Sequence, residues 1–268
     1  MSQPVDLYNS FYSHFTSDVL TAVREETYGV DIGQDSWVTV DEYDRLISWL
    51  RLSPQHHVLD VASGSGGPAL HIARTVGCRV TGIDMNENGV AAAQQSAAHS
   101  EQGERVHFTV ADATARLPFP DGAFDAILCI DAFNHLLPRL MVLREWHRLL
   151  RPGRRAVFTD PVVISGPVTN DELATRSSIG AFLFVPPGVN EQLITEAGFR
   201  LVLQEDGTQN ASKVAGRWHG ARQRHRDALL GIEGDERFEG LQRFLDMVRR
   251  LTSERRLTRM WYLAEKPG

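Results

Sequence analysis

Short apolar segments alternate with amphipathic segments through the middle of the chain. The apolar runs have the length of buried strands, and the segments between them repeat apolar residues with helical spacing. We expect strands at about 57–61, 79–83, 105–110, 124–130 and 154–159, and helices at about 67–76, 87–99 and 138–150. Because short strands alternate with helices of this length, the pattern predicts an α/β fold with a parallel, doubly wound sheet.

The two ends of the chain depart from this alternation. The first 50 residues look helical, with apolar side chains at every fourth position: Leu7, Phe11, Phe15 and Val19. Thr39 and Glu42 form a capping-box pattern, which predicts a further helix that ends before Pro54. Toward the C-terminus we expect a helix at 189–197, a strand at about 199–205, a helical excursion at about 208–254 and a last strand at about 257–264.

The length and composition limit the size, the partners and the location that we can expect for this protein. The 268 residues, 42% of them hydrophobic, suffice for one large α/β domain or for such a domain with an insertion. The net charge of -6 does not favour nucleic acid as the main partner. No apolar run approaches the roughly 20 residues that span a bilayer, and the first six residues lack the features of a secretion signal. We therefore expect a cytoplasmic protein with no membrane partner.

The cysteines and histidines do not indicate a metal site. Cys78 and Cys129 each lie in or beside a predicted strand, and we expect both to be reduced core residues. His56 and His57 are neighbours, so a strand would point them to opposite sides. Because no cluster of these residues has the spacing of metal ligands, no metal is expected.

The first candidate chemistry is a glycine-rich turn after the strand at 57–61. It runs from Gly64 through Gly66 to Ala69 and satisfies the fingerprint of dinucleotide-binding proteins. Glycine at Gly64 and Gly66 would let the backbone pass close to a ligand. Asp84 follows Gly64 by 20 residues, where a carboxylate can reach the hydroxyls of an adenosine ribose. The motif predicts a nucleoside-containing cofactor, and by itself it allows a nicotinamide-dependent oxidoreductase.

Further features favour a different cofactor. Asp60 ends the first strand just before the turn, where its carboxylate would repel a pyrophosphate but suits a cationic ammonium group. Asp112 follows the third strand, where it could accept a hydrogen bond from an adenine amino group. The stretch 119–131 predicts a turn and a buried strand that ends at the acidic Asp131, and 150–153 closes the helix before the fifth strand.

Together these features resemble the class I S-adenosylmethionine-dependent methyltransferases, most strongly over 55–165. The resemblance implies a seven-stranded, mostly parallel, Rossmann-like sheet and S-adenosylmethionine as the cofactor. Asp84 would then bind the ribose and Met85 would pack on the adenine. The methionine end of the cofactor would be cradled by Ala62, Ser63, Gly64 and Gly66. The edge of the adenine would be bordered by Asp112 and Ala113. The family usually has glycine where this chain has Ala62, and we expect a tighter turn there without loss of binding.

A narrower likeness covers nearly the whole chain. It resembles small-molecule methyltransferases that act on sarcosine and dimethylglycine, on phosphoethanolamine, or on sterols and tocopherols. The likeness implies three parts: a helical lid at 1–54, a cofactor-binding core at 55–164, and a C-terminal half of the sheet at 165–268 with a helical cap at about 208–254. Tyr12 and Trp37 become lid candidates, with Trp37 assigned to the cofactor and Tyr12 to the substrate. The alternative is that both rings only pack the helices on the sheet.

The acceptor is expected over the carboxyl ends of the fourth and fifth strands. His135 is the candidate general base because an imidazole titrates in the useful range, although it could instead pack or cap the next helix. Asp131 could fix the substrate or close the cofactor pocket, and Asp160 is a weaker alternative. Trp218 is assigned to the substrate, with a core position as its alternative.

The predicted function is transfer of a methyl group to N, O or C of a small-molecule acceptor. The alternatives are a nicotinamide-dependent oxidoreductase and a methyltransferase-fold binding protein without turnover. Arginines at 222, 224 and 226 could bind an anionic substrate, but a solvated helix face is the preferred interpretation. The acceptor's identity and the choice between monomer and homodimer stay open.

Overall fold

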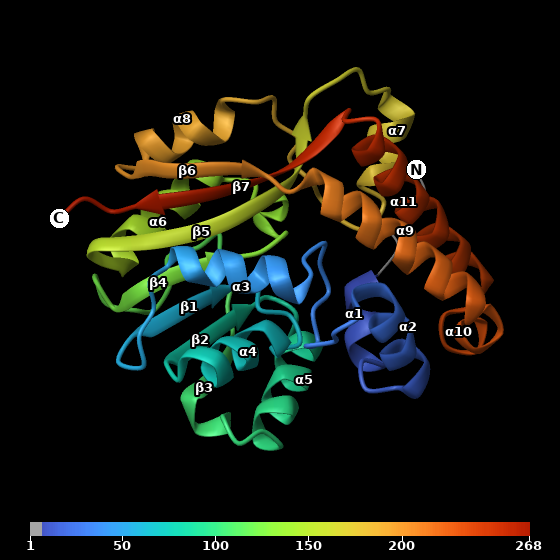
Figure 1. Ribbon diagram of the computed structural model, residues 1–268, viewed down its shortest axis with the longest axis horizontal. Helices are drawn as coiled ribbons and strands as arrows, with labels where there is room; N and C mark the ends of the chain where they lie inside the picture. The colour runs from blue at the N-terminus through green and yellow to red at the C-terminus, as the bar shows by residue number, and fades with distance from the viewer. Residues whose placement is uncertain (1–6) are drawn as a thin grey trace.

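A computed structural model describes residues 7–268 and shows one sheet covered by helices on both faces (Figure 1). Its seven strands lie in the order β3-β2-β1-β4-β5-β7-β6. They are β1 (His57–Val61), β2 (Arg79–Asp84), β3 (Val106–Val110), β4 (Phe124–Cys129), β5 (Leu150–Ile164), β6 (Arg200–Asp206) and β7 (Leu257–Glu265). Only β7 runs antiparallel to its neighbours. The predicted doubly wound, mostly parallel sheet is confirmed.

Each face of the sheet has its own apolar core. One face is covered by α3 (Val40–Trp49), α4 (Gly67–Val76) and α5 (Glu87–Ala98). The other face is covered by α6 (Arg139–Leu149) and α8 (Val189–Glu196), with the fully buried Trp146 between helix and sheet. Because both faces are covered, the central strand β4 is buried at every residue, including Asp125.

The remaining helices form a third apolar cluster beyond one end of the sheet, on the right of Figure 1. Here α2 packs on α9, and α11 packs on both α9 and α7. The helices concerned are α1 (Leu7–Ser13), α2 (Asp18–Tyr28), α7 (Asn170–Arg176), α9 (Thr208–Arg224), α10 (Arg226–Glu233) and α11 (Asp235–Ser253). Segments far apart in the chain therefore meet in one helical group. Within residues 7–268, no helix combines the length and the apolar character needed to cross a membrane.

Some local expectations were wrong in detail. The apolar repeat at the N-terminus is interrupted, because α1 ends at Ser13 and α2 begins at Asp18. Thr39 is the N-cap of α3, yet its side chain makes no capping bond, and Glu42 turns toward the sheet instead. Strand β5 is longer than 154–159 because it pairs with β7 along most of its length. The first six residues, on which the expectation of no secretion signal was based, lie outside the described residues.

Candidate active site

The glycine-rich turn connects β1 to α4 at the carboxyl end of the sheet. Gly64 and Gly66 have φ values of +53° and +79°, a conformation that side chains rarely adopt. A Cβ atom on Gly64 would lie 2.6 Å from the Tyr12 hydroxyl, and one on Gly66 would lie 2.5 Å from the ring of Phe108. Side chains of the protein are therefore one reason for glycine at both positions, and the close approach of this turn to a ligand stays a prediction.

Ala62 has a backbone conformation that favours glycine. Its φ is +58°, in the left-handed region where a Cβ atom approaches the following carbonyl. Such a residue costs about 1–2 kcal/mol relative to the right-handed conformation. The turn keeps its shape with a methyl group at this position, because Ala62 is half-buried at the edge of the cavity described below.

The loop at 29–38 crosses directly over this turn. Ser65 donates a hydrogen bond to the carbonyl of Gly33 at 3.0 Å. A Cβ atom on Gly67 would lie only 1.8 Å from the carbonyl oxygen of Ile32, so the two backbones are in contact. Glycine at this first position of α4 is what allows the N-terminal segment to close over the turn.

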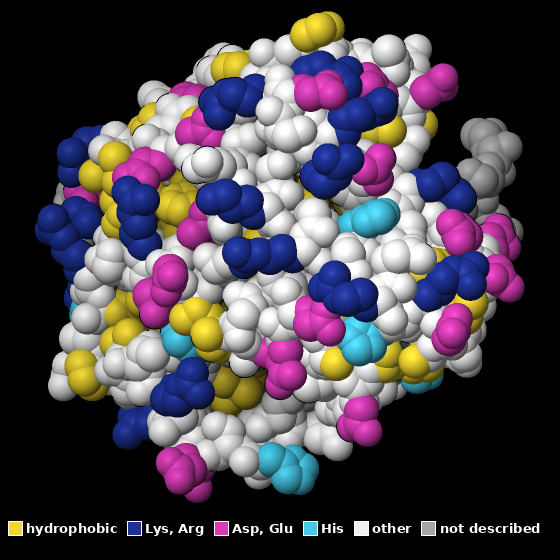
Figure 2. All heavy atoms as spheres, turned by 45° about the vertical axis from the view of Figure 1, so that its right-hand side comes forward, with side chains coloured by type: hydrophobic (Ala, Val, Ile, Leu, Met, Phe, Trp, Pro, Cys, Tyr) yellow, Lys and Arg dark blue, Asp and Glu magenta, His cyan; other side chains and the backbone are white. Residues whose placement is uncertain are grey.

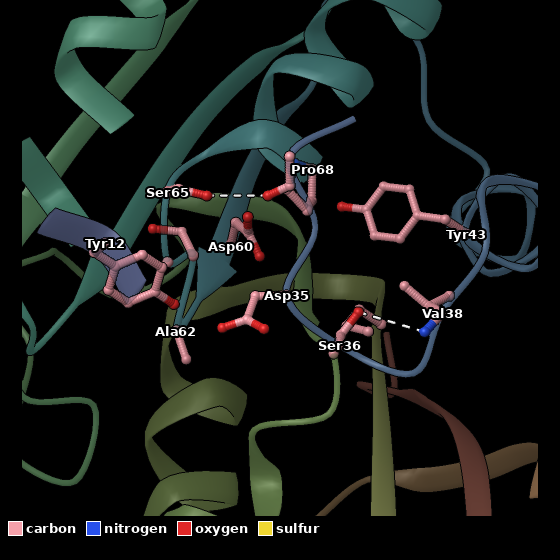
Figure 3. A pocket seen from close by; sticks show the side chains of 13 residues that line it. Tyr12, Asp35, Ser36, Val38, Tyr43, Asp60, Ala62, Ser65 and Pro68 are labelled. Atoms are coloured by element: carbon pink, nitrogen blue, oxygen red, sulfur yellow. Dashed lines mark hydrogen bonds between the residues drawn. The ribbon is translucent and has the colours of Figure 1, made fainter. Parts of the chain in front are cut away.

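A cavity lies beneath this loop (Figure 3). Asp60 and Asp35 project into it from opposite sides, between Tyr12 and Tyr43. None of its described lining residues is a lysine, arginine or histidine. The buried polar atoms without a hydrogen-bond partner among the described residues include Asp35 Oδ2, Asp60 Oδ2, Ser63 Oγ and the Tyr43 hydroxyl. We call this space the acidic cavity.

The two carboxyl groups have strongly perturbed acidities. Burial raises the pKa of Asp60 to about 8, with a further contribution from the charge of Asp84. Burial also raises the pKa of Asp35 to about 7. A buried carboxylate is costly without a cation. The acidic cavity therefore fits a cationic group, whereas the negative charge of a pyrophosphate would be repelled.

Asp84 stands at the end of β2, where the adenosine of a nucleoside cofactor is expected. Its Oδ2 accepts a hydrogen bond from the Gly64 backbone at 2.9 Å, and its Oδ1 accepts one from the Asn86 backbone at 2.8 Å. Met85, the next residue, is 75% exposed, and Val110, the partner of Asp84 on β3, is 49% exposed. Large exposed apolar side chains at adjacent strand ends offer a surface that a flat base would cover.

The adenine-edge candidates differ in exposure. Asp112 is exposed, and its Oδ1 accepts hydrogen bonds from the backbone and hydroxyl of Thr114 at 2.8 and 2.7 Å. This contact is the turn-forming role that an aspartate often has in loops. Ala113 is buried. Neither residue lines the acidic cavity, and their role at the adenine edge stays a prediction.

A second cavity adjoins the first, and Asp35 and Ser36 line both. Its lining includes five large aromatic rings, and Trp37 and Trp218 are in contact at 5.9 Å between ring centroids. We call it the aromatic cavity. The described residues that line it also include Tyr8, Asp131, Asn134, His135, Pro161, Arg176, Ile179, Phe182 and Phe244.

The structure exchanges the places expected for two aromatic residues. Tyr12, assigned to the substrate, lies in the acidic cavity because α1 packs on α5 and places its ring against Gly89. Trp37, assigned to the cofactor, lines the aromatic cavity because Trp218 and Phe244 hold its ring there. Trp218 lies on the same wall, as expected for a residue near the acceptor.

Asp131 joins the sheet to the loop that carries Trp37. Its Oδ2 accepts a hydrogen bond from the Trp37 backbone at 2.8 Å, and its Oδ1 accepts one from Arg259 at 2.7 Å. The Thr159 hydroxyl is also within 2.7 Å of Oδ1. Both oxygens are thus engaged, which assigns Asp131 to positioning the cavity wall and leaves little capacity to bind substrate.

His135 lies in the short 3-10 helix η2 (Phe133–His135) and borders the aromatic cavity. Its Nδ1 is 3.1 Å from the carbonyl oxygen of Ala181, so this nitrogen must carry the proton. Nε2 is then the acceptor, and the Tyr8 hydroxyl lies 3.1 Å from it. Burial lowers the pKa of His135 to about 4, so the ring is neutral at physiological pH. Asp160, in contrast, is fully buried in an ion pair with Arg139 at 2.7 Å.

Three residues of the site were missed from the sequence. Asp35 stands in the same polar loop as Asp31, which forms an ion pair with Arg24 at 2.9 Å, and nothing in the local pattern distinguishes the two. Tyr43 lies in the helix predicted to end before Pro54, and Arg176 lies in α7, where no helix was predicted. No sequence signal marks them, because their roles depend on partners distant in the chain.

The arginine-rich segment of the cap has ordinary ion-pair partners. Arg222 is buried and pairs with Glu233 through two contacts, at 2.9 and 2.7 Å. Arg224 pairs with Glu26 of α2. Figure 2 shows basic and acidic side chains interspersed over this face. The structure thus supports the interpretation as an ordinary helix surface.

The fold and the site define a Rossmann-like protein that holds a cationic nucleoside cofactor. A model of the methyltransferase domain family matches residues 58–153. A 27-O-demethylrifamycin SV methyltransferase from Amycolatopsis mediterranei is 29% identical over 232 residues, which cover 81% of this chain and 84% of that protein. A sarcosine/dimethylglycine N-methyltransferase from Halorhodospira halochloris is 30% identical over 205 residues, which cover 73% of this chain and 70% of that protein.

A solved structure agrees on the fold. The phosphoethanolamine N-methyltransferase 2 of Haemonchus contortus, in complex with phosphomonomethylethanolamine and S-adenosylhomocysteine, has a TM-score of 0.81 and 19% identity. The match covers 97% of this chain and 60% of that one. The chain belongs to the S-adenosylmethionine-dependent methyltransferases, and S-adenosylmethionine is its cofactor. The nicotinamide alternative is thereby excluded.

Proposed function

We propose that the enzyme transfers the methyl group of S-adenosylmethionine to a small-molecule acceptor bound in the aromatic cavity. The observation that carries this proposal is the junction of the two cavities at Asp35 and Ser36. When bound, the cofactor supplies an electrophilic methyl carbon on a sulfonium, and an acceptor beyond the junction can approach that carbon in line. The names of the relatives, which include a rifamycin and a sarcosine methyltransferase, also support a small acceptor.

The chain's own contribution is to bind, orient and exclude water. We infer that Asp60 and Asp35 hold the cationic groups of the cofactor, because both carboxylates lack a cationic partner among the described residues that line the cavity. The turn at 62–66 borders the methionine end, and Asp84 holds the ribose. The segment 1–54 acts as a lid, since its loop at 29–38 already covers the turn. Enclosure of this kind keeps the reacting groups aligned and dry.

We propose His135 as the general base for an acceptor that must lose a proton. The Ala181 carbonyl fixes the tautomer, so Nε2 is free of its own proton and faces the hydroxyl of Tyr8. An acceptor hydroxyl or amine would take the place of this hydroxyl or bond through it. The competing interpretation, a packing role, draws on the edge-on contact of His135 with Phe182 at 4.6 Å.

A screen for methylated products tests the proposed function directly. The full chain is incubated with isotopically labelled S-adenosylmethionine and a panel of amines, phenols and carboxylic acids, and the products are examined by mass spectrometry. Label should appear in at least one small molecule. Labelled products found only on macromolecules would contradict the proposal.

An Asp84→Ala variant should bind S-adenosylhomocysteine about 1–3 kcal/mol more weakly than the wild type, because charge-assisted hydrogen bonds to the ribose are lost. Isothermal titration calorimetry measures the difference. Asp121→Ala is the matched control, since this exposed carboxylate pairs only with Arg148 among the described residues and lies outside both cavities. Unchanged affinity in Asp84→Ala would refute the ribose role.

A His135→Gln variant should lower kcat by about 10²–10⁴-fold, the contribution of a positioned base, and should leave S-adenosylhomocysteine affinity within twofold. Because the pKa of His135 lies near 4, the basic form is lost only as pH falls through that value, and kcat should depend little on this ring above about pH 5. His147→Gln is the control, since His147 packs on Phe199 away from the site. Wild-type turnover in His135→Gln would leave only the packing role.

We also infer a cytoplasmic location. Cys78 and Cys129 are both free and buried, as reduced core thiols are. The net charge of -6 gives no support for nucleic acid as a partner.

A further inference from the structure

One buried arginine of the aromatic cavity has no ionic partner among the described residues. Arg176, at the end of α7, is 2% exposed and lines the cavity. Its Nη1 is buried without a hydrogen-bond partner. Three aromatic rings surround the guanidinium, with centroids 4.9 Å (Phe182), 5.1 Å (Phe244) and 5.8 Å (Trp37) away. Burial lowers the pKa of Arg176 to about 10, so it is still a cation at neutral pH.

Other buried arginines in the described residues are all neutralised by an acid. Arg139 pairs with Asp160 and Arg259 pairs with Asp131, each at 2.7 Å, so neither aspartate is free to neutralise Arg176. Glu172, one turn earlier on α7, pairs instead with Arg250 and Arg256. The remaining buried pairs are Arg24 with Asp31 and Arg222 with Glu233.

An unpaired buried cation costs several kcal/mol, and aromatic rings offset only part of that cost. We propose that Arg176 binds a carboxylate group of the methyl acceptor. This proposal rests on the proposed function, in which the aromatic cavity holds that acceptor. A guanidinium matches the two oxygens of a carboxylate through parallel hydrogen bonds.

The surroundings of Arg176 define the acceptor further. Among the described residues that line the cavity, the only other basic one is His135, which is neutral, so a doubly charged phosphate would lack a second cation. The aromatic walls suit an aryl or otherwise apolar body. Asp35 lies at the junction with the acidic cavity and, when ionised beside the cationic cofactor, would repel the carboxylate of the acceptor, which favours the orientation that points the nucleophile toward the methyl donor. The acceptor class is therefore an apolar or aromatic carboxylic acid.

Matched acids and amides test this assignment on the protein saturated with S-adenosylhomocysteine. The probes are benzoate, phenylacetate and 4-hydroxybenzoate, each with its amide, and binding is followed by the fluorescence of Trp37 and Trp218 and by calorimetry. At least one acid should bind tenfold or more tightly than its amide. In Arg176→Met, which keeps the length and removes the charge, that ratio should fall to within twofold, and Arg176→Lys should retain part of it.

Controls separate this inference from the proposed function. Arg226→Met changes an arginine outside the cavity and should leave the ratio unchanged. Thermal unfolding of Arg176→Met should match or exceed the wild type, since the unpaired buried charge is gone. A wild type without acid preference, or a ratio unchanged in Arg176→Met, would overturn the inference while normal S-adenosylhomocysteine binding upholds the enzyme class. A wild type that binds neither S-adenosylhomocysteine nor any probe would overturn both.

Discussion

An Arg259→Met variant should lose about 3–5 kcal/mol of unfolding free energy, the range for breaking a buried ion pair from one side. Arg259 lies on β7 with a fully buried side chain. Its Nε donates to Asp131 at 2.7 Å and its Nη1 to Glu42 at 3.0 Å. It thereby joins β7 to the end of β4 and to α3. Methionine fills much of the same space, so the loss comes mainly from the carboxylates left without a cation.

Urea denaturation followed by circular dichroism measures this loss. Arg45→Met is the control, because Arg45 is 56% exposed in its ion pair with Glu205, and exposed pairs contribute about 0–1 kcal/mol. Adding Asp131→Asn to Arg259→Met should recover part of the stability, since one buried charge is removed. A loss below 1 kcal/mol in Arg259→Met would show that water reaches the pair.

A Gly67→Ala variant should bind S-adenosylhomocysteine at least tenfold more weakly than the wild type. The added methyl group would lie 1.8 Å from the Ile32 carbonyl oxygen and 2.8 Å from the Gly33 Cα, both backbone atoms. Overpacking of this kind typically costs about 1–3 kcal/mol. The loop at 29–38 must shift to relieve the overlap, and that shift removes Asp35 from the acidic cavity.

Calorimetry with S-adenosylhomocysteine measures the effect, and Gly231→Ala provides the matched control. Gly231 lies in α10, and a Cβ atom there would meet nothing within 4 Å. The control should keep wild-type affinity and gain slightly in stability, because alanine favours a helix over glycine by about 1 kcal/mol. Affinity within twofold of the wild type in Gly67→Ala would show that closure of the loop is not required for binding.

The sequence located Asp60 and Asp84 at the edge of the sheet for a simple reason. Each lies in the last two residues of a buried strand, and the carboxyl ends of parallel strands share one edge of the sheet. Periodicity locates such strands well, so it also locates the residues at their ends. His135 was found in the same way, a few residues beyond β4.

Helices and loops gave no such guide to the direction of their side chains. Tyr12 and Trp37 were both recognised as lid residues, yet their cavities were exchanged, because the rings are directed by α5 in one case and by α9 and α11 in the other. Asp31 and Asp35 look alike in the sequence. They differ in the structure because Arg24 forms an ion pair with Asp31 and not with Asp35.

The sequence by itself determined the sheet, the glycine turn and the acidic strand ends, because each depends on residues that are neighbours in the chain. The tertiary structure decided which charges are neutralised. Asp131 and Asp160 form ion pairs with arginines on distant segments. Among the described residues, Asp35, Asp60 and Arg176 form no ion pair with a residue of opposite charge. Long-range packing alone sets these partners, and the charges that it leaves unpaired are the ones that we propose bind the cofactor and the acceptor.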